Sequence, residues 1–185
     1  MSSHAPARDR RPNIAAMNTL PSTPASSLRT LYWEDFPAGH VTDCGSTTMS
    51  REAILDFARQ FDPQPFHVDE AAASHSLYGG LVASGWHTCS VAMRLMCDAY
   101  LLRTSSQGSP GVDELRWLKP VYPGDTLTLS MTVLESRPMR SKPHLGLVQS
   151  QWEMRNQHGQ SVLSMRGWGM FKRRPDVLPE QEMAD

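Results

Sequence analysis

The chain lacks the features that would place it in a membrane, on a nucleic acid or in a disulfide framework. It has no run of the ~20 apolar residues that a membrane-spanning helix needs. Its formal net charge of −1 offers no basic surface to a polyanion. Cys44, Cys89 and Cys97 are an odd number with no metal-ligand spacing, which fits reduced thiols better than a disulfide scaffold. We therefore predict a cytoplasmic protein with no nucleic-acid or membrane partner.

The length of 185 residues suits one domain between two polar segments. Residues 1–30 hold prolines, serines and an arginine cluster without apolar periodicity, so we predict disorder there. That segment also lacks the apolar core of a secretory signal, and Met17 is an alternative start. Residues 31–174 are the predicted folded domain, and residues 175–185 are a polar, acidic tail.

Residues 61–69, Phe-Asp-Pro-Gln-Pro-Phe-His-Val-Asp, place an acid and an imidazole five positions apart. Pro63 and Pro65 restrict the backbone, which predicts a rigid, extended loop leaving a helix. Two titratable side chains held at a fixed separation can transfer protons, so Asp62 and His67 are a candidate acid/base pair. These nine residues alone are equally compatible with a turn and a solvated histidine.

A second segment, Ser84-Gly85-Trp86, opens a mostly apolar run that extends to Leu102. A small residue and a glycine before such a run predict a helix N-terminus, whose free N–H groups favour negative charge. The backbone amide of Gly85 is therefore a candidate oxyanion donor. A third segment, from Leu115 to Leu127, includes Pro-Val-Tyr-Pro-Gly-Asp at residues 120–125 and predicts a strand, a turn and a further strand.

The hydrophobic pattern of the remaining chain predicts an α+β fold. Ser50 is a candidate N-cap, and the residues after it make one apolar face at helical spacing: Ile54, Leu55, Phe57, Ala58 and Phe61. A second short helix is predicted over residues 71–75, and the helix from Gly85 is apolar on most faces, which predicts burial. Strands are predicted over residues 41–49, 127–133, 145–154 and 162–171, with a hairpin turn at 156–159. One buried helix followed by antiparallel strands predicts a sheet wrapped on that helix.

The three segments, in this order, resemble the MaoC-like dehydratases, the (R)-specific enoyl-thioester hydratases of the hotdog fold. The family pattern of Asp, Asn-Pro and His-x-Asp is matched by Asp62, Pro65, His67 and Asp69. The resemblance extends from about Tyr32 to about Arg174. It implies a single hotdog domain, with an antiparallel sheet around a long central helix, that assembles as a homodimer or a dimer of dimers.

The resemblance also implies a site. Asp62 and His67 would hold a water near the β-carbon of an enoyl thioester, and the Gly85 amide would bind the thioester oxygen. The implied substrate-binding residues are Gln64, Pro65, Ser84, Trp86 and Trp117. No metal or cofactor is implied, and the acyl thioester belongs to coenzyme A or acyl carrier protein.

Two departures from the family pattern concern the acid/base pair. Gln64 stands where the family has asparagine, which keeps the amide and lengthens its reach. Some members place a hydroxyl near the pair from the central helix. In this chain that position falls around Ala92 or Met93, so we expect no hydroxyl there.

Two alternative functions remain open on the same fold. One is an acyl thioesterase, and the other is an acyl-thioester-binding protein without turnover. The intact pair of Asp62 and His67 favours the hydratase, because a binder has no chemical need for it. Ser84-Gly85 lacks the Gly-x-Ser-x-Gly context of a hydrolase nucleophile.

Other polar residues have simpler interpretations. His67 and Asp69 have no third ligand at metal spacing, and Asp69 is better explained as a helix N-cap. His87 is predicted to be a core histidine with its hydrogen bonds satisfied. The basic loop with Arg137, Arg140 and Lys142 suits either the phosphates of coenzyme A or plain solvation.

Overall fold

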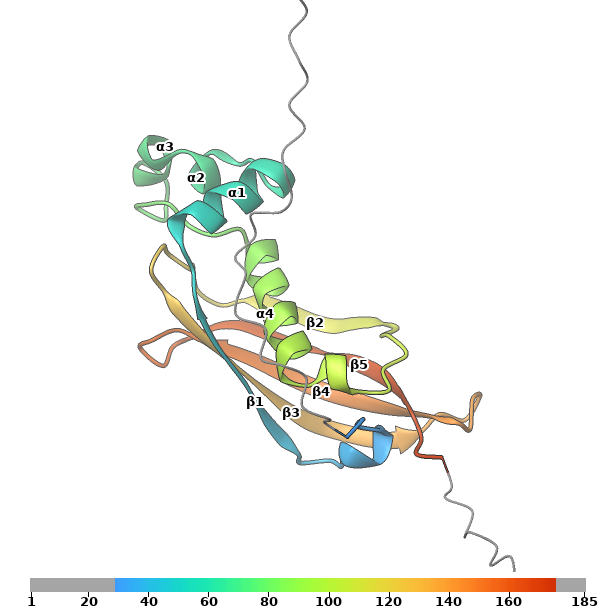
Figure 1. Ribbon diagram of the computed structural model, residues 1–185. Helices are drawn as coiled ribbons and strands as arrows, with labels where there is room; N and C mark the ends of the chain where they lie inside the picture. The colour runs from blue at the N-terminus through green and yellow to red at the C-terminus, as the bar shows by residue number, and fades with distance from the viewer. Residues whose placement is uncertain (1–28, 176–185) are drawn as a thin grey trace, which may run out of the picture.

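A computed structural model describes residues 29–175 as one antiparallel sheet with a long helix lying along one face (Figure 1). The strands are β1 (Val41–Thr48), β2 (Gly111–Trp117), β3 (Thr126–Pro138), β4 (Leu145–Arg155) and β5 (Ser161–Lys172). The helices are α1 (Arg51–Phe61), α2 (Pro65–Val68), α3 (Glu70–Ser74) and α4 (Gly85–Ala99), with 3₁₀ turns η2 (Trp33–Asp35) and η3 (Leu101–Arg103). The sheet order is β1-β3-β4-β5-β2, so β1 and β2 are its edges. The α+β prediction is confirmed.

The core lies between α4 and the sheet. The predicted alternation in β3 is confirmed, because Leu127, Leu129, Met131 and Val133 are each at most 1% exposed. Burying a side chain of this size contributes roughly 1.5–3 kcal/mol relative to exposure. The hairpin of β4 and β5 also follows its predicted bounds to within a residue or two. These strands therefore form the rigid support of α4.

Burial of α4 is less complete than its composition predicts. One face, with Ala92, Leu95 and Met96, is buried, but Trp86 is 57% exposed and Met93 is 49% exposed. Leu102 lies beyond the helix in η3 and is 75% exposed. A single sheet can cover only one face of a helix, so the opposite apolar face stays uncovered within the chain. The prediction of an all-round buried helix is wrong for these residues.

The three short helices α1, α2 and α3 stack beyond the N-terminal end of α4 (Figure 1). Their predicted caps are confirmed: Ser50 accepts a hydrogen bond from the Ala53 N–H at 3.1 Å, and Asp69 caps α3. Phe61 is 67% exposed, in contrast to its predicted place on the buried face of α1.

The linker after α1 is shorter than predicted. Gln64 is extended, but Pro65 begins α2, where its fixed φ and missing N–H suit the first helical turn. His67 therefore lies on a short helix and not on a loop. This helix orients the imidazole toward the C-terminal end of α1, where Asp62 lies.

The two ends of the described chain are tied together. The Arg174 guanidinium donates to both oxygens of Asp35 in η2 at 2.9 Å, and Trp33 packs on Gly146, where a side chain would find no space. Residues 1–28 and 176–185 lie outside the described residues, so the predictions of disorder and of a polar tail stay predictions. None of the described helices has the length and apolar character to cross a membrane.

Candidate active site

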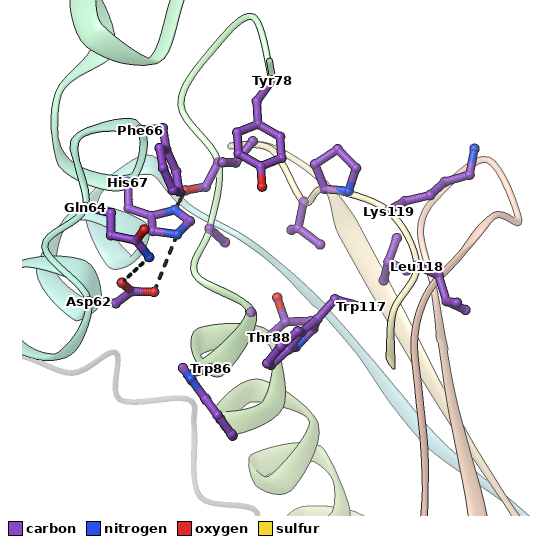
Figure 2. A pocket seen from close by; sticks show the side chains of 16 residues that line it. Asp62, Gln64, Phe66, His67, Tyr78, Trp86, Thr88, Trp117, Leu118 and Lys119 are labelled. Carbon is purple, nitrogen blue, oxygen red and sulfur yellow. Dashed lines mark hydrogen bonds and ion pairs between the residues drawn. The ribbon is translucent and has the colours of Figure 1, made fainter. Parts of the chain in front are cut away.

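A cavity of about 480 Å³ opens beside the N-terminus of α4. Its walls come from the α1–α2 junction, residues 78–88 and residues 117–121, with Val162 of β5 in addition (Figure 2). Among the predicted site residues it is lined by Asp62, Gln64, His67, Gly85, Trp86 and Trp117. The fold thus gathers six of the eight predicted residues around one space.

Asp62 and His67 face each other on one wall. Asp62 is the C-cap of α1, and its Oδ2 lies 3.5 Å from His67 Nε2. The other ring nitrogen, Nδ1, is 2.8 Å from the carbonyl oxygen of Val82. A carbonyl only accepts, so Nδ1 carries a proton, and in neutral His67 the Nε2 is an acceptor. When His67 is neutral, two acceptors therefore lie side by side, at a separation longer than an ordinary hydrogen bond.

Two side chains donate hydrogen bonds to the Asp62 carboxylate. Gln64 Nε2 donates to Oδ1 at 2.8 Å, and Ser84 Oγ donates to Oδ2 at 2.7 Å. Burial raises the pKa of Asp62, but these two hydrogen bonds and the nearby His67 outweigh it and lower the pKa below its usual value. Asp62 is therefore ionised at neutral pH and ready to accept a proton.

The hydroxyl expected to be missing from this site is present. No hydroxyl comes from Ala92 or Met93, but Ser84 supplies one from the residue before α4, 22 positions from Asp62 in the sequence. Ser84 is fully buried and also accepts from the Trp86 N–H at 3.2 Å. Ser84 therefore caps α4 and anchors Asp62 at once. Neither Ser84 nor Pro65 lines the cavity: Ser84 contacts Asp62 from behind its wall, and Pro65 is exposed at the start of α2.

Gly85 begins α4 and lines the cavity. A Cβ at this position would lie 2.5 Å from Cε2 of Trp117, so only glycine lets the ring approach. As a first-turn residue, Gly85 has an N–H without an acceptor inside the helix. Trp86 meets Trp117 edge to face, with ring centroids 5.3 Å apart. The helix start and two tryptophans thus form the lower wall in Figure 2.

Sequence reasoning missed other residues of the cavity wall: Phe66, Tyr78, Thr88 and Lys119. Tyr78 precedes two glycines in a turn, a pattern that indicates a loop and gives no sign of where the phenol points. Tyr78 reaches the cavity because the loop between α3 and α4 folds over α2, where its ring packs on Phe66.

His87 lies next to the cavity wall without facing it. Its ring stacks on Phe57 at 4.7 Å and is buried, as predicted, but Nδ1 has no hydrogen-bond partner in the described chain. Burial lowers the pKa of His87 to about 4, so the ring is neutral at neutral pH. The prediction of a buried histidine is confirmed, and the prediction of satisfied hydrogen bonds is wrong.

The basic loop lies apart from the cavity. Arg137 and Arg140 line a separate hollow beside the turn that joins β3 to β4. Arg137 also pairs with Glu135 at 2.8 Å and lies over the ring of Trp168. Within residues 29–175 no three His, Cys, Asp or Glu side chains are grouped as metal ligands would be.

Comparison with known proteins identifies a family for most of the described chain. Residues 37–152 match the family model described as MaoC like domain. The crystal structure of a MaoC-like dehydratase from Rhodospirillum rubrum has a TM-score of 0.72 and 41% sequence identity, covering 78% of this chain and 99% of that one. An (R)-hydratase from A. caviae involved in PHA biosynthesis shares the fold, with a TM-score of 0.61 and 19% identity over 77% of this chain and 99% of the other.

A longer relative is also similar. Mesaconyl-CoA hydratase of Cereibacter sphaeroides is 28% identical over 171 residues, which is 92% of this chain. The match covers 42% of the hydratase, so this chain spans less than half its length.

Proposed function

Because the chain belongs to the MaoC-like domain family and has the hotdog fold, we propose that it hydrates enoyl thioesters reversibly in the cavity beside α4. One observation supports this most: Asp62 Oδ2 and His67 Nε2 lie 3.5 Å apart on the cavity wall, and both are acceptors when His67 is neutral. A water molecule has two hydrogens to donate, and this pair can accept both. The water oxygen is then left with its lone pairs facing the cavity.

The proposed reaction follows from that geometry. The water oxygen bonds to the β-carbon of the enoyl group while one member of the pair takes a water proton. The electrons of the double bond shift to the thioester oxygen, which the Gly85 N–H stabilises at the start of α4. The pair then returns a proton to the α-carbon, which gives the 3-hydroxyacyl thioester. Elimination is the same path in reverse, and neither direction requires a metal or a redox cofactor.

The acyl group comes from an acyl thioester of coenzyme A or acyl carrier protein. We also propose a homodimer. Large apolar side chains are exposed along and just beyond the edge strand β2: Val112, Trp117 and Leu118, at 54%, 48% and 48% exposure. A free edge with such side chains favours pairing with a second chain.

The test is the loss of enoyl absorbance with crotonyl-coenzyme A. Wild type should hydrate it, while Asp62→Asn and His67→Ala should each lose about 100-fold or more in kcat. The matched controls are Asp56→Asn and His75→Ala, which change exposed residues of the same types outside the cavity. Loss of activity in the first pair only, with folding intact, supports the proposal.

Two outcomes would overturn it. Thiol release without hydration would indicate a thioesterase. Absence of any reaction by folded protein, with longer and branched enoyl thioesters as well, would indicate a binding protein.

A further inference from the structure

The upper wall of the cavity in Figure 2 has a polar group that the proposed hydration does not use. The phenol oxygen of Tyr78 points into the cavity, on the side away from Trp86. Its hydrogen bonds within residues 29–175 use the backbone: the N–H donates to Ser76, and the carbonyl accepts from the Tyr122 hydroxyl at 2.9 Å. Among residues 29–175, the hydroxyl of Tyr78 therefore has no hydrogen-bond partner.

Contacts with neighbouring residues fix the position of this phenol. The Tyr78 ring packs on Phe66 at 5.3 Å, and the Phe66 ring stands edge-on to His67 at 4.5 Å. These aromatic contacts and the bond from Tyr122 fix the residue on both its side chain and its backbone. A ring placed in this way can hold its hydroxyl toward a substrate without further ordering.

Lys119 also lines the cavity, on the side opposite Asp62, and its ammonium group is directed away from the cavity in Figure 2. The ion pairs among the described residues all involve an arginine or His67, and none involves Lys119. Its ammonium group is exposed at the end of a flexible stem, so it can turn toward an anion at the opening. Asp62 is the one acid of the lining, and Gln64 and Ser84 already hold it.

We propose that Tyr78 and Lys119 form an anion-accepting subsite for a carboxylate on the acyl group. The preferred substrate class is then an enoyl thioester of a dicarboxylic acid. This deepens the proposed hydratase function and rests on it. A hydrocarbon chain against the Tyr78 hydroxyl would displace its water without replacing the hydrogen bond, whereas a carboxylate accepts from both the phenol and the ammonium.

A phosphate of the carrier presents the same anionic chemistry to Lys119. The two sources are distinguished by changing acyl group and carrier independently. The four substrates are the crotonyl and fumaryl thioesters of coenzyme A and of N-acetylcysteamine. Coenzyme A carries phosphates, whereas N-acetylcysteamine has none. The measured quantity is kcat/KM for fumaryl relative to crotonyl with each carrier.

We expect wild type to prefer the fumaryl thioesters. Tyr78→Phe keeps the ring and removes the hydroxyl, and it should lower the fumaryl-to-crotonyl ratio about tenfold with both carriers. Lys119→Met should lower the ratio by several-fold, and less so at high salt, because exposed charges are screened. Lys172→Met, an exposed lysine away from the cavity, is the matched control and should leave the ratio unchanged.

Equal losses for crotonyl and fumaryl thioesters in both variants would overturn the proposal. A Lys119 effect confined to the coenzyme A thioesters would assign that lysine to the carrier phosphates and would overturn its carboxylate role. Titration calorimetry with the non-reacting thioether analogues of butyryl- and succinyl-coenzyme A covers the case of no turnover. If wild type binds the succinyl analogue more tightly and Tyr78→Phe loses this preference, the subsite is supported even if the hydratase proposal fails. Equal affinities of wild type for the two analogues would contradict the subsite.

Discussion

The chemistry of the site depends on how one carboxylate is held. Asp62 receives hydrogen bonds from a neighbour in sequence, Gln64, and from the distant Ser84. Both stabilise the charged form, which explains why the pKa of Asp62 is lowered in spite of its burial. The longer side chain of Gln64, in place of asparagine, still reaches the carboxylate at 2.8 Å. The amide that the sequence keeps at this position therefore serves as a donor to Asp62.

A pH profile tests this arrangement. Gln64→Leu removes one donor to the Asp62 carboxylate, so the pKa of Asp62 should rise toward its ordinary value. Asp62 must be ionised to accept a proton, so the acid limb of the kcat/KM profile should move to higher pH. The lost bond should also reduce kcat/KM at neutral pH by up to about tenfold. The measurement is hydration of crotonyl-coenzyme A from pH 4 to pH 9.

The matched control is Gln60→Leu. Gln60 is exposed on α1, and its amide donates to the Asp56 carbonyl instead. Its profile should overlay that of wild type. An acid limb that does not move in Gln64→Leu, or that moves equally in the control, would contradict the assignment.

At the scale of elements, the start of α4 and the end of β2 are fitted to each other. Gly85 leaves room for the Trp117 ring, and Ser84 fixes the first turn of the helix. Glycine at a helix start ordinarily has no advantage over serine or alanine in propensity. Its presence here is explained by the close approach of the Trp117 ring.

A double-mutant cycle tests this fit. Gly85→Ala places a Cβ 2.5 Å from the Trp117 ring, so the ring or the helix start must move, and kcat should fall about 100-fold. In a Trp117→Ala background the Cβ has space, and the same change should cost much less. Circular dichroism should show that all four proteins are folded. Equal costs of Gly85→Ala in both backgrounds would show that the contact with Trp117 does not determine the effect.

At the scale of the whole molecule, the apolar surface that a single chain leaves exposed to solvent suggests a partner. The exposed face of α4 and the edge strand β2 both present large apolar side chains, including Trp86, Met93 and Val112. The cavity lies close to this surface, because Trp86 and Trp117 belong to both. Pairing of two β2 strands would cover these side chains and narrow the cavity opening.

Light scattering after size-exclusion chromatography tests the assembly. Wild type should have a mass of twice the 20.7 kDa chain or a multiple of that. Val112→Lys places a charge on the β2 edge and should shift the mass to one chain. Val41→Lys makes the same change on the opposite edge, at a valine that is 63% exposed, and should leave the mass unchanged. A monomeric wild type would contradict the proposed dimer.

Much of the architecture could be predicted from the sequence because it depends on local physics. The alternation in β3 and the N-caps Ser50 and Asp69 each act within a few residues. The pair of Asp62 and His67 was identified in the same way, since one short segment contains both. The cytoplasmic location and the roles of the site residues stay predictions.

Tertiary structure decided what depends on distant segments meeting. Ser84 reaches Asp62 because the loop after α3 returns beside α1, and that same return brings Tyr78 over the cavity. Phe57 stacks on the buried ring of His87, whose Nδ1 has no hydrogen-bond partner among residues 29–175. Composition could not show which face of α4 the sheet would leave open. Local sequence sets the propensity of each element, whereas the neighbours of a side chain are determined by how those elements pack.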